Sequence, residues 1–262
     1  GLCISSDFMA EQRARQSPTG PSQPAGDFIE VYDAALEGSF CADLISRFEH
    51  SPHRRAGQTG GGLDPDRKLS TDLRVSDHAE FAVEVGYLEH ILTDFLTRYF
   101  ARYRFALIAP IGLTVRHPVS GEAVALNDQN FSEIGEPQLG LLMKSLYRIG
   151  PIQVQKYDAG RGNYDYWHCE VFPERRGTDA LHRTLFWLAY LNDVEQGGHT
   201  EFYYQDRAIQ PKAGRLLVAP AYFTHTHRGR IPISGDKYIA TGWVMIRSAE
   251  QLYRSPQQRP AG

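Results

Sequence analysis

IQVQKYDAGRGNYDYWHCEVF, residues 152–172, consists of two apolar-rich runs on either side of a glycine-containing turn. Runs rich in β-branched and aromatic residues and bounded by glycine are typical of strands joined by turns. Four more runs of this kind follow in the sequence: TLFWLAYLN (184–192), HTEFYY (199–204), RLLVAPA (215–221) and KYIATGWVMI (237–246). Many short strands separated by such turns predict a barrel or a double-sheet jelly roll from about residue 147 onward.

The N-terminal half has helical patterns instead. After a strand-like run at 28–32, a helix is expected over 40–48 with Ser39 as its N-cap, because apolar residues recur there at helical spacing. A longer helix is expected over about 78–102, capped by Asp77. We therefore predict an α+β, mainly β protein, with a double-stranded β-helix (jelly-roll) core and supporting N-terminal helices.

The two ends of the chain differ in composition from its centre. Residues 10–26 are rich in proline, glycine and serine, so 1–26 are expected to be a disordered arm, with 1–8 a candidate expression remnant. A chain of 262 residues, 42% of them hydrophobic, can form one large core. We expect a single domain over 27–250 and a tail over 251–262.

Two long segments lie outside these patterns. The glycine content of 50–68 predicts a loop that stays without order unless a ligand or partner holds it. Residues 116–137 are a candidate lid or entrance wall, since loops on a rigid scaffold often select the substrate. Leu141, Leu142 and Met143 are expected in a helix core.

His168 and Glu170 are the first candidate metal ligands. Residues two apart on a strand point to the same face, so both side chains can reach one barrel interior. A third ligand must come from a distant run, and the local pattern leaves His225 and His227 as the choices. Two imidazoles and one carboxylate form the ligand set of non-haem Fe(II) sites with open coordination positions.

Lys237 begins a later strand-like run, ten residues after His227. An ammonium group buried without a partner would be costly, and a dicarboxylic co-substrate would offset that cost. The alternative is an ordinary lysine on an edge strand with its charged end in water.

These pieces together resemble the 2-oxoglutarate- and Fe(II)-dependent dioxygenases of the prolyl 4-hydroxylase type. The resemblance is close over about 95 residues, 152–246, and looser over 28–50. Its motifs are YDAG (157–160), HCE (168–170), YLNDVEQGGHTEF (190–202), PKAGRLLVAP (211–220), HRGRIP (227–232), Lys237 and Trp243.

The resemblance implies a ligand set and cofactors. His168, Glu170 and His227 become the iron ligands, because the ten-residue step to Lys237 is kept only from His227. Lys237 becomes the anchor of the distal carboxylate of 2-oxoglutarate, and Tyr157 a hydrogen-bonding partner of this co-substrate. No catalytic residue is implied beyond the metal ligands. The implied cofactors are Fe(II), 2-oxoglutarate and O2, with ascorbate as a candidate reductant, and the implied reaction hydroxylates a C–H bond and releases succinate and CO2.

The sequence departs from the family pattern at a few positions. Glu170 replaces the usual aspartate, and Phe186 stands where a threonine is usual. The segment between Tyr157 and His168 is about two residues longer than usual, so Tyr164 and Tyr166 compete with Tyr157 for its role. Further candidates for contacts around the metal or the substrate are Arg183, His225 and Trp243.

Composition excludes several classes of partner. The net charge of −3 is unlike the basic surface of a nucleic-acid-binding protein. Three widely spaced cysteines form no disulfide framework or zinc motif, and no apolar run is long enough to span a bilayer. We expect a cytoplasmic protein with a small-molecule or peptide substrate; its oligomeric state stays open. The alternatives are a cupin-like metal enzyme that uses no oxygen and a metal-binding jelly-roll module.

Overall fold

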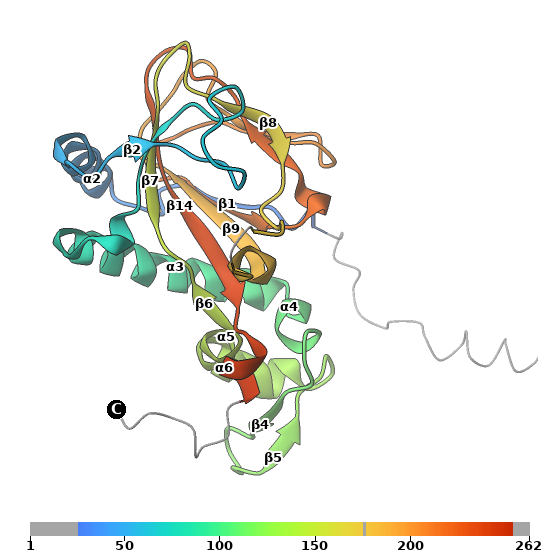
Figure 1. Ribbon diagram of the computed structural model, residues 1–262. Helices are drawn as coiled ribbons and strands as arrows, with labels where there is room; N and C mark the ends of the chain where they lie inside the picture. The colour runs from blue at the N-terminus through green and yellow to red at the C-terminus, as the bar shows by residue number, and fades with distance from the viewer. Residues whose placement is uncertain (1–25, 175–176, 254–262) are drawn as a thin grey trace, which may run out of the picture.

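The computed structural model describes residues 26–174 and 177–253, and its centre is a pair of facing antiparallel sheets (Figure 1). The strands begin in the N-terminal part and dominate after residue 147, as predicted, while the longest helices precede them. This arrangement confirms the expected α+β jelly-roll core with N-terminal helices. The predicted arm and most of the predicted tail lie outside the described residues.

The large sheet has the strand order β1-β12-β9-β14-β7-β3-β2, with β6 paired to β14. Its strands are β1 (Glu30–Tyr32), β2 (Arg55–Ala56), β3 (Thr71–Leu73), β6 (Tyr147–Ile149), β7 (Gln153–Tyr157), β9 (Arg183–Tyr190), β12 (Leu216–Pro220) and β14 (Lys237–Ile246). The small sheet has the order β11-β10-β13-β8. Its strands are β8 (Tyr164–His168), β10 (Thr200–Phe202), β11 (Arg207–Ile209) and β13 (His227–Gly229).

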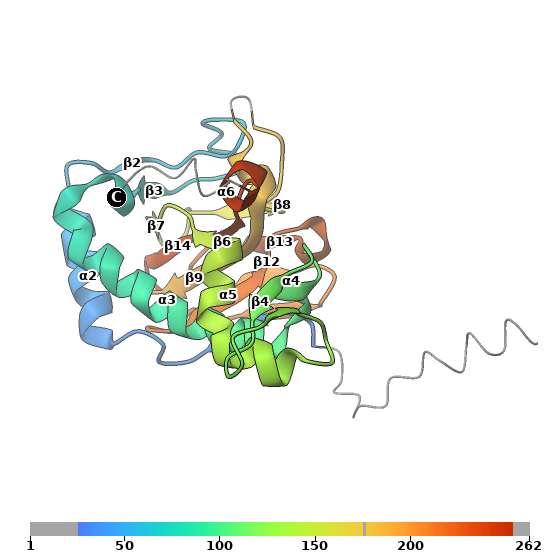
Figure 2. The same ribbon diagram turned by 90° about the horizontal axis from the view of Figure 1, so that it is seen from below.

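The helices lie mainly against one face of the large sheet, as the view from below shows (Figure 2). They are α2 (Gly38–His50), α3 (Ala82–Arg102), α4 (Phe105–Ile108), α5 (Leu139–Leu146) and α6 (Ala249–Tyr253). Short single turns connect the elements: η1 (Val75–Asp77), η2 (Ala79–Phe81), η3 (Phe131–Gly135), η4 (Glu136–Gln138), η5 (Asp179–His182) and η6 (Phe223–His225). None of the described helices is both long and apolar enough to cross a bilayer.

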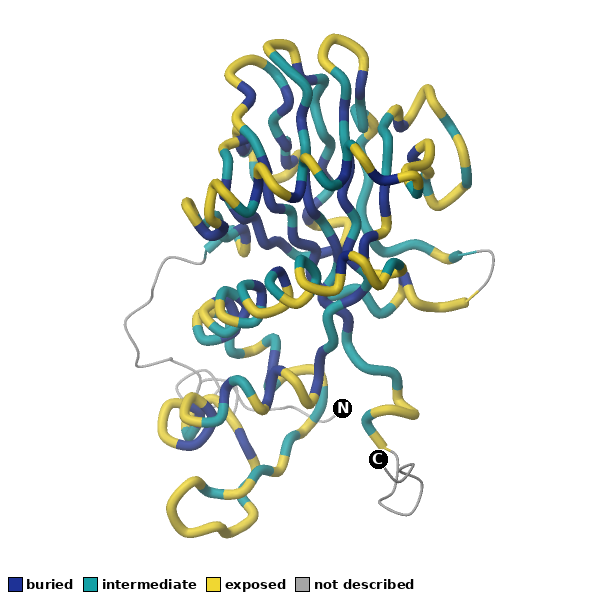
Figure 3. Tube along the Cα trace, turned by 90° about the vertical axis from the view of Figure 1, so that its left-hand side faces the viewer, coloured by how far each residue is buried: buried dark blue, intermediate teal, exposed yellow. Residues whose placement is uncertain are grey.

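Strand alternation divides the core into two layers. On β9, Leu185, Trp187 and Ala189 belong to the cluster that packs under the helices. Phe186 and Tyr190 point to the opposite face and pack inside the jelly roll. Both faces of this strand are therefore buried, and Figure 3 shows buried residues gathered at the centre of the molecule. This burial explains why the 184–192 run is apolar almost throughout instead of alternating.

Two helix starts differ from the sequence prediction. Helix α2 has Glu37 at its N-cap without a side-chain cap, and Ser39 lies inside the first turn. Asp77 belongs to η1, and α3 begins five residues later at Ala82. Both capping assignments were wrong because serine and aspartate also suit the first turn of a helix and short turns, so their presence alone does not fix a boundary.

The segment after α3 forms a lobe at the bottom of Figure 1, and its buried side chains belong to the same core cluster as those of α3. It contains α4, α5 and the hairpin of β4 (Thr114–Arg116) and β5 (Ala123–Ala125). Leu142 and Met143 are buried in α5 as predicted, but Leu141 is 65% exposed. The prediction failed at Leu141 because three consecutive residues of a helix cannot all face one side.

The glycine-rich segment 50–68 is ordered, contrary to the expectation. Its flanks pair as the β2–β3 hairpin, and the backbone groups of Thr59 and Gly62 bond to each other in both directions. Leu69 bridges to Asn163, which ties the loop to the turn before β8. A Cβ at Gly60 would lie 2.3 Å from the Phe172 ring, so glycine allows the loop to pack directly on that side chain. The loop thus forms one wall of the pocket described next.

Candidate metal centre and its pocket

Three potential metal ligands converge between the two sheets. His168 is the last residue of β8, and His227, the first residue of β13, is its direct cross-strand partner. Glu170 lies just beyond the end of β8, and its backbone N–H donates to the carbonyl of Ala221. The expectation that His168 and Glu170 share one strand was therefore wrong in detail, although both side chains do point to the same place.

The distances and hydrogen bonds leave one nitrogen of each imidazole free. His168 Nε2 lies 3.6 Å and His227 Nε2 lies 3.3 Å from Glu170 Oε1. The opposite ring nitrogens are engaged: His168 Nδ1 with the carbonyl of Tyr166 at 2.7 Å, and His227 Nδ1 with the carbonyl of His225 at 3.0 Å. These backbone contacts fix the orientation of both rings so that Nε2 faces the carboxylate.

Glu170 is held from two further directions. Trp243 Nε1 donates to Glu170 Oε2 at 2.8 Å. Arg183 Nη1 donates to the Glu170 backbone carbonyl at 2.9 Å, and its guanidinium lies 3.7 Å from the centre of the Trp243 ring. These contacts leave Oε1 directed at the two imidazoles and fix the carboxylate without covering that oxygen.

Electrostatics favour the protonation states that a metal ion requires. Burial, and then the neighbouring His227, lower the pKa of His168, so its ring is neutral. Burial by itself would raise the pKa of Glu170, but the contacts with His168 and His227 outweigh it and the pKa lies well below its usual range. A neutral imidazole beside an ionised carboxylate is the metal-binding form of these groups.

The donor set fits a divalent ion. Two ligands at right angles, each about 2.1 Å from one ion, lie about 3 Å apart, close to the observed separations from Glu170 Oε1. Nitrogen and oxygen donors of this kind suit Fe(II), and three protein ligands leave positions open for small molecules.

The three side chains open into a cavity of about 430 Å³ between the sheets. Strands β7, β9 and β14 form its floor through Tyr157, Phe186, Leu188, Lys237, Ile239 and Thr241, and the loop after β2 forms one wall through Gln58, Thr59 and Gly60. No described residue from 104–140 lines this cavity, so the assignment of 116–137 as a lid or entrance wall was wrong. That segment belongs to the lobe beneath the sheet (Figure 1).

Lys237 lies on the cavity floor and is only 3% exposed. Its ammonium group donates to the carbonyl of Gly198 at 3.0 Å and lies 4.6 Å from the centre of the Tyr157 ring, on the cross-strand neighbour. Burial lowers the pKa of Lys237 to about 7. The alternative of a lysine whose charged end reaches water is therefore excluded for this residue.

The three tyrosines that are candidates for contact with the co-substrate lie in different places. Tyr157 is buried, lines the cavity and donates a hydrogen bond to Gln155 Oε1 at 2.8 Å. Tyr164 also lines the cavity, stacked on the His168 ring with centroids 3.9 Å apart. Tyr166 is exposed and packs under the guanidinium of Arg67 outside the cavity.

His225 is not placed as a ligand. Its Nε2 contacts the carbonyl of Asp27 at 2.8 Å and its Nδ1 contacts Thr224 Oγ1 at 3.0 Å, so both ring nitrogens are engaged. Its backbone carbonyl instead orients the ring of His227. This contact explains how two histidines two residues apart have different positions relative to the cavity.

Two further polar residues of the cavity were missed by the sequence analysis. Lys68 is buried and its ammonium lies 2.6 Å from Asp72 Oδ2. Gln155 bonds Tyr157 through its carbonyl oxygen, and its amide nitrogen lies 3.3 Å from the same Asp72 oxygen. Gln155 could have been found, since it shares a strand face with Tyr157. Lys68 carried no signal, because it follows an irregular loop.

The candidate ligands and Lys237 lie within a segment that matches a known family. The family model of the 2OG-Fe(II) oxygenase superfamily matches residues 152–245. A protein from Arabidopsis thaliana, "Probable prolyl 4-hydroxylase 9", is 28% identical over 129 residues, which are 40% of this chain and 40% of that protein. The chain therefore aligns with less than half the length of this curated relative.

A solved structure shows the same fold. A Trichoplax adhaerens prolyl hydroxylase, in complex with a hypoxia inducible factor oxygen degradation domain peptide fragment, has a TM-score of 0.55 at 14% identity. The match covers 95% of this chain and 96% of that one. The viral collagen prolyl hydroxylase of Paramecium Bursaria Chlorella virus-1 has a TM-score of 0.48 at 19% identity, over 85% of this chain and 98% of the other. Residues 152–245 therefore form a segment of the 2OG-Fe(II) oxygenase superfamily, and the chain is similar to a probable prolyl 4-hydroxylase.

Proposed function

We propose that the chain is a hydroxylase that uses Fe(II), 2-oxoglutarate and O2 and releases succinate and CO2. The observation that supports this most is the convergence of His168, Glu170 and His227 in a cavity whose floor holds the buried ammonium of Lys237. A metal centre alone would fit several enzyme classes. Among the described residues, the ammonium group of Lys237 has one hydrogen-bond partner, a neutral carbonyl, and this favours an anionic co-substrate in the same cavity.

In this proposal, His168, Glu170 and His227 hold the iron. The bound iron would supply activation of O2 coupled to the oxidative decarboxylation of 2-oxoglutarate. Trp243 and Arg183 keep the Glu170 carboxylate in place, through the indole N–H and through the backbone carbonyl. Since these contacts orient a ligand without touching the metal position, they would set the affinity for iron.

Lys237 would bind the distal carboxylate of 2-oxoglutarate. A protonated amine suits a single carboxylate end, because it acts as a point charge and demands no fork geometry. The hydroxyl of Tyr157 would provide a further hydrogen bond, with Tyr164 as the competing donor. Phe186 stacks on the His227 ring with centroids 4.3 Å apart and, with Ile239, would exclude water from the co-substrate.

The substrate would enter past the loop after β2. The cavity there is polar, with Gln58, Thr59 and Arg183 among its lining residues. A prolyl residue in a peptide is our first candidate, because the curated relative is named as a prolyl 4-hydroxylase. A free amino acid or another small molecule is the second. Ascorbate would act as the reductant that keeps iron in the ferrous state.

The test is succinate formation by the purified protein with Fe(II), 2-oxoglutarate and O2. Turnover without the prime substrate is expected to be slow but measurable, and a panel of prolyl peptides and amino acids should raise it. His168→Ala should abolish the signal, and His90→Ala, on the exposed side of α3, should not change it. A cupin-like enzyme that uses no oxygen, or a binding module, would form no succinate with any member of the panel.

A further inference from the structure

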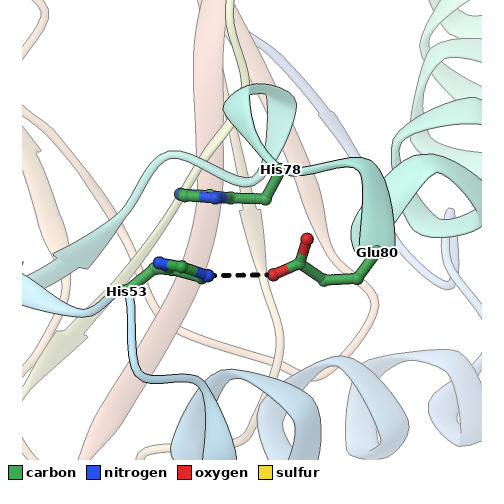
Figure 4. A group of neighbouring side chains, drawn as sticks. All are labelled: His53, His78 and Glu80. Carbon is green, nitrogen blue, oxygen red and sulfur yellow. Dashed lines mark ion pairs between the residues drawn. The ribbon is translucent and has the colours of Figure 1, made fainter.

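A second group of metal-binding side chains lies outside the cavity: His53, His78 and Glu80 (Figure 4). His53 follows α2, His78 lies between η1 and η2, and Glu80 belongs to η2. We propose that these three side chains bind one divalent ion such as Zn²⁺, which links the two ends of the β2–β3 hairpin. The inference does not depend on the activity proposed above.

The geometry brings one donor atom from each residue together. His53 Nε2 lies 3.2 Å from Glu80 Oε1, and the potential ligand atoms of all three residues lie within 4.8 Å of one another. The two imidazole rings are stacked, with centroids 4.0 Å apart and 15° between their planes. Two imidazoles and one carboxylate are a zinc ligand set in which water fills the remaining position.

The contact between His53 and Glu80 contributes too little stability to explain this arrangement. About 40% of the His53 side chain and 48% of the Glu80 side chain are exposed, and a pair this exposed contributes little stability. Arg47 donates to the Glu84 carboxylate and to the backbone carbonyl of Glu80, and not to the Glu80 carboxylate. The Glu80 carboxylate is therefore left to His53 and accessible to an ion from solvent.

Binding requires one change in the cluster. The lone pair of an imidazole nitrogen lies in the plane of its ring, so two parallel rings cannot both point at one ion. His53 or His78 must rotate about its side-chain bonds, and their half-buried positions leave room on the solvent side. The stacked pair would then serve as the metal-free arrangement and would break when the ion binds.

The position of the cluster gives the ion a structural consequence. His53 stands two residues before β2, and His78 five residues after β3, so the cluster joins the two ends of the hairpin. Between these strands lies the loop that contributes Gln58, Thr59 and Gly60 to the cavity wall. An ion shared by both ends restricts the opening of the hairpin and thereby holds this wall in place.

The test counts the Zn²⁺ retained by the whole chain after dialysis against micromolar zinc sulfate. The His168→Ala/His227→Ala variant removes the first metal centre, so an ion that it still binds lies elsewhere. We expect this variant to bind one equivalent, and expect at least tenfold weaker binding when His53→Ala and His78→Ala are added. The matched control is His90→Ala in the same background, since His90 faces Asp94 at 4.0 Å as an ordinary exposed pair.

Hydrogen exchange gives the second measurement. Adding Zn²⁺ to the His168→Ala/His227→Ala variant should slow exchange in residues 54–73, and the further loss of His53 and His78 should remove this effect. Equal zinc binding with and without His53 and His78, or no zinc retained by the double variant, would overturn the site. Unchanged hydrogen exchange in residues 54–73 on zinc binding would overturn the claim that the ion restricts the hairpin.

Discussion

Replacing Lys237 by methionine is expected to stabilise the ligand-free protein and to weaken co-substrate binding. Burial lowers the pKa of Lys237 from 10.5 to about 7, and at about 1.4 kcal/mol for each unit of pKa this difference costs about 5 kcal/mol of folding free energy. Methionine has no charge to desolvate. It also loses the hydrogen bond to the Gly198 carbonyl, which contributes about 1–2 kcal/mol. We therefore expect a gain of about 3 kcal/mol at pH 7.

The sign of the pH dependence follows from the same shift. In the unfolded chain the lysine keeps its proton up to about pH 10.5, whereas the folded chain releases it near pH 7. The destabilising effect of Lys237 is complete at and below pH 7 and disappears as the pH rises toward 10.5. Denaturant unfolding at pH 7, 8.5 and 10 should therefore show a shrinking difference between the Lys237→Met variant and the wild type.

The same substitution should weaken the binding of 2-oxoglutarate, although it stabilises the ligand-free protein. A charge-assisted hydrogen bond contributes about 1.5–3 kcal/mol, so the KM for 2-oxoglutarate should rise about 10- to 150-fold. Succinate release at varied 2-oxoglutarate concentrations measures it. Lys212→Met, which removes an ammonium group that is 60% exposed, is the control and should change neither stability nor KM. A Lys237→Met protein that is less stable and has an unchanged KM would refute the reasoning.

Three further substitutions test other parts of the site and the fold. His168→Ala should lower the iron retained after dialysis at least tenfold, measured by elemental analysis. Trp243→Phe removes the N–H that donates to Glu170 and should weaken Fe(II) binding about 10- to 100-fold, with activity restored by excess Fe(II). Gly197→Ala forces a Cβ to 2.2 Å from a backbone carbonyl at a φ of 72°, so its free energy of unfolding should fall by about 2 kcal/mol or more. Gly235→Ala meets nothing within 4 Å and should leave thermal unfolding unchanged.

Most strands and the candidate metal ligands could be predicted from the sequence because their signals are local and repeated. Each run after residue 147 combines β-branched or aromatic residues with a glycine or proline turn, and such runs correspond to β7, β8, β9, β10, β12 and β14, whereas β11 and β13 were not predicted. His168 and His227 lie far apart in the chain, but His168 is the last residue of β8 and His227 is the first residue of β13. Strand pairing then makes them direct neighbours.

The residues around the ligands were harder to predict because their partners come from other elements. The role of His225 depends on the carbonyl of Asp27, almost two hundred residues away, which occupies its Nε2. Lys68 is buried only because its loop folds over the cavity and Asp72 neutralises it. The His225 contact joins distant parts of the chain, whereas Lys68 and Asp72 are only four residues apart, and their spacing alone does not show that the pair is buried. The cytoplasmic location and the domain boundaries stay predictions.

The two buried charges of the cavity, Glu170 and Lys237, have different surroundings, and this difference favours the binding of an anion. Glu170 has a complete set of partners, with two imidazoles at one oxygen and the Trp243 N–H at the other, and its pKa is held well below the usual range. Lys237 has one neutral carbonyl, and its pKa falls. A cost of about 5 kcal/mol is large beside the total stability of about 5–15 kcal/mol of a typical domain. Since Ile239, two residues along the same strand face, shows that an apolar side chain fits this floor, stability alone would favour an apolar residue at 237. An anion that binds in the cavity would return the proton to Lys237 and recover the lost free energy as affinity, so the protein should be more stable with the proposed co-substrate than without it.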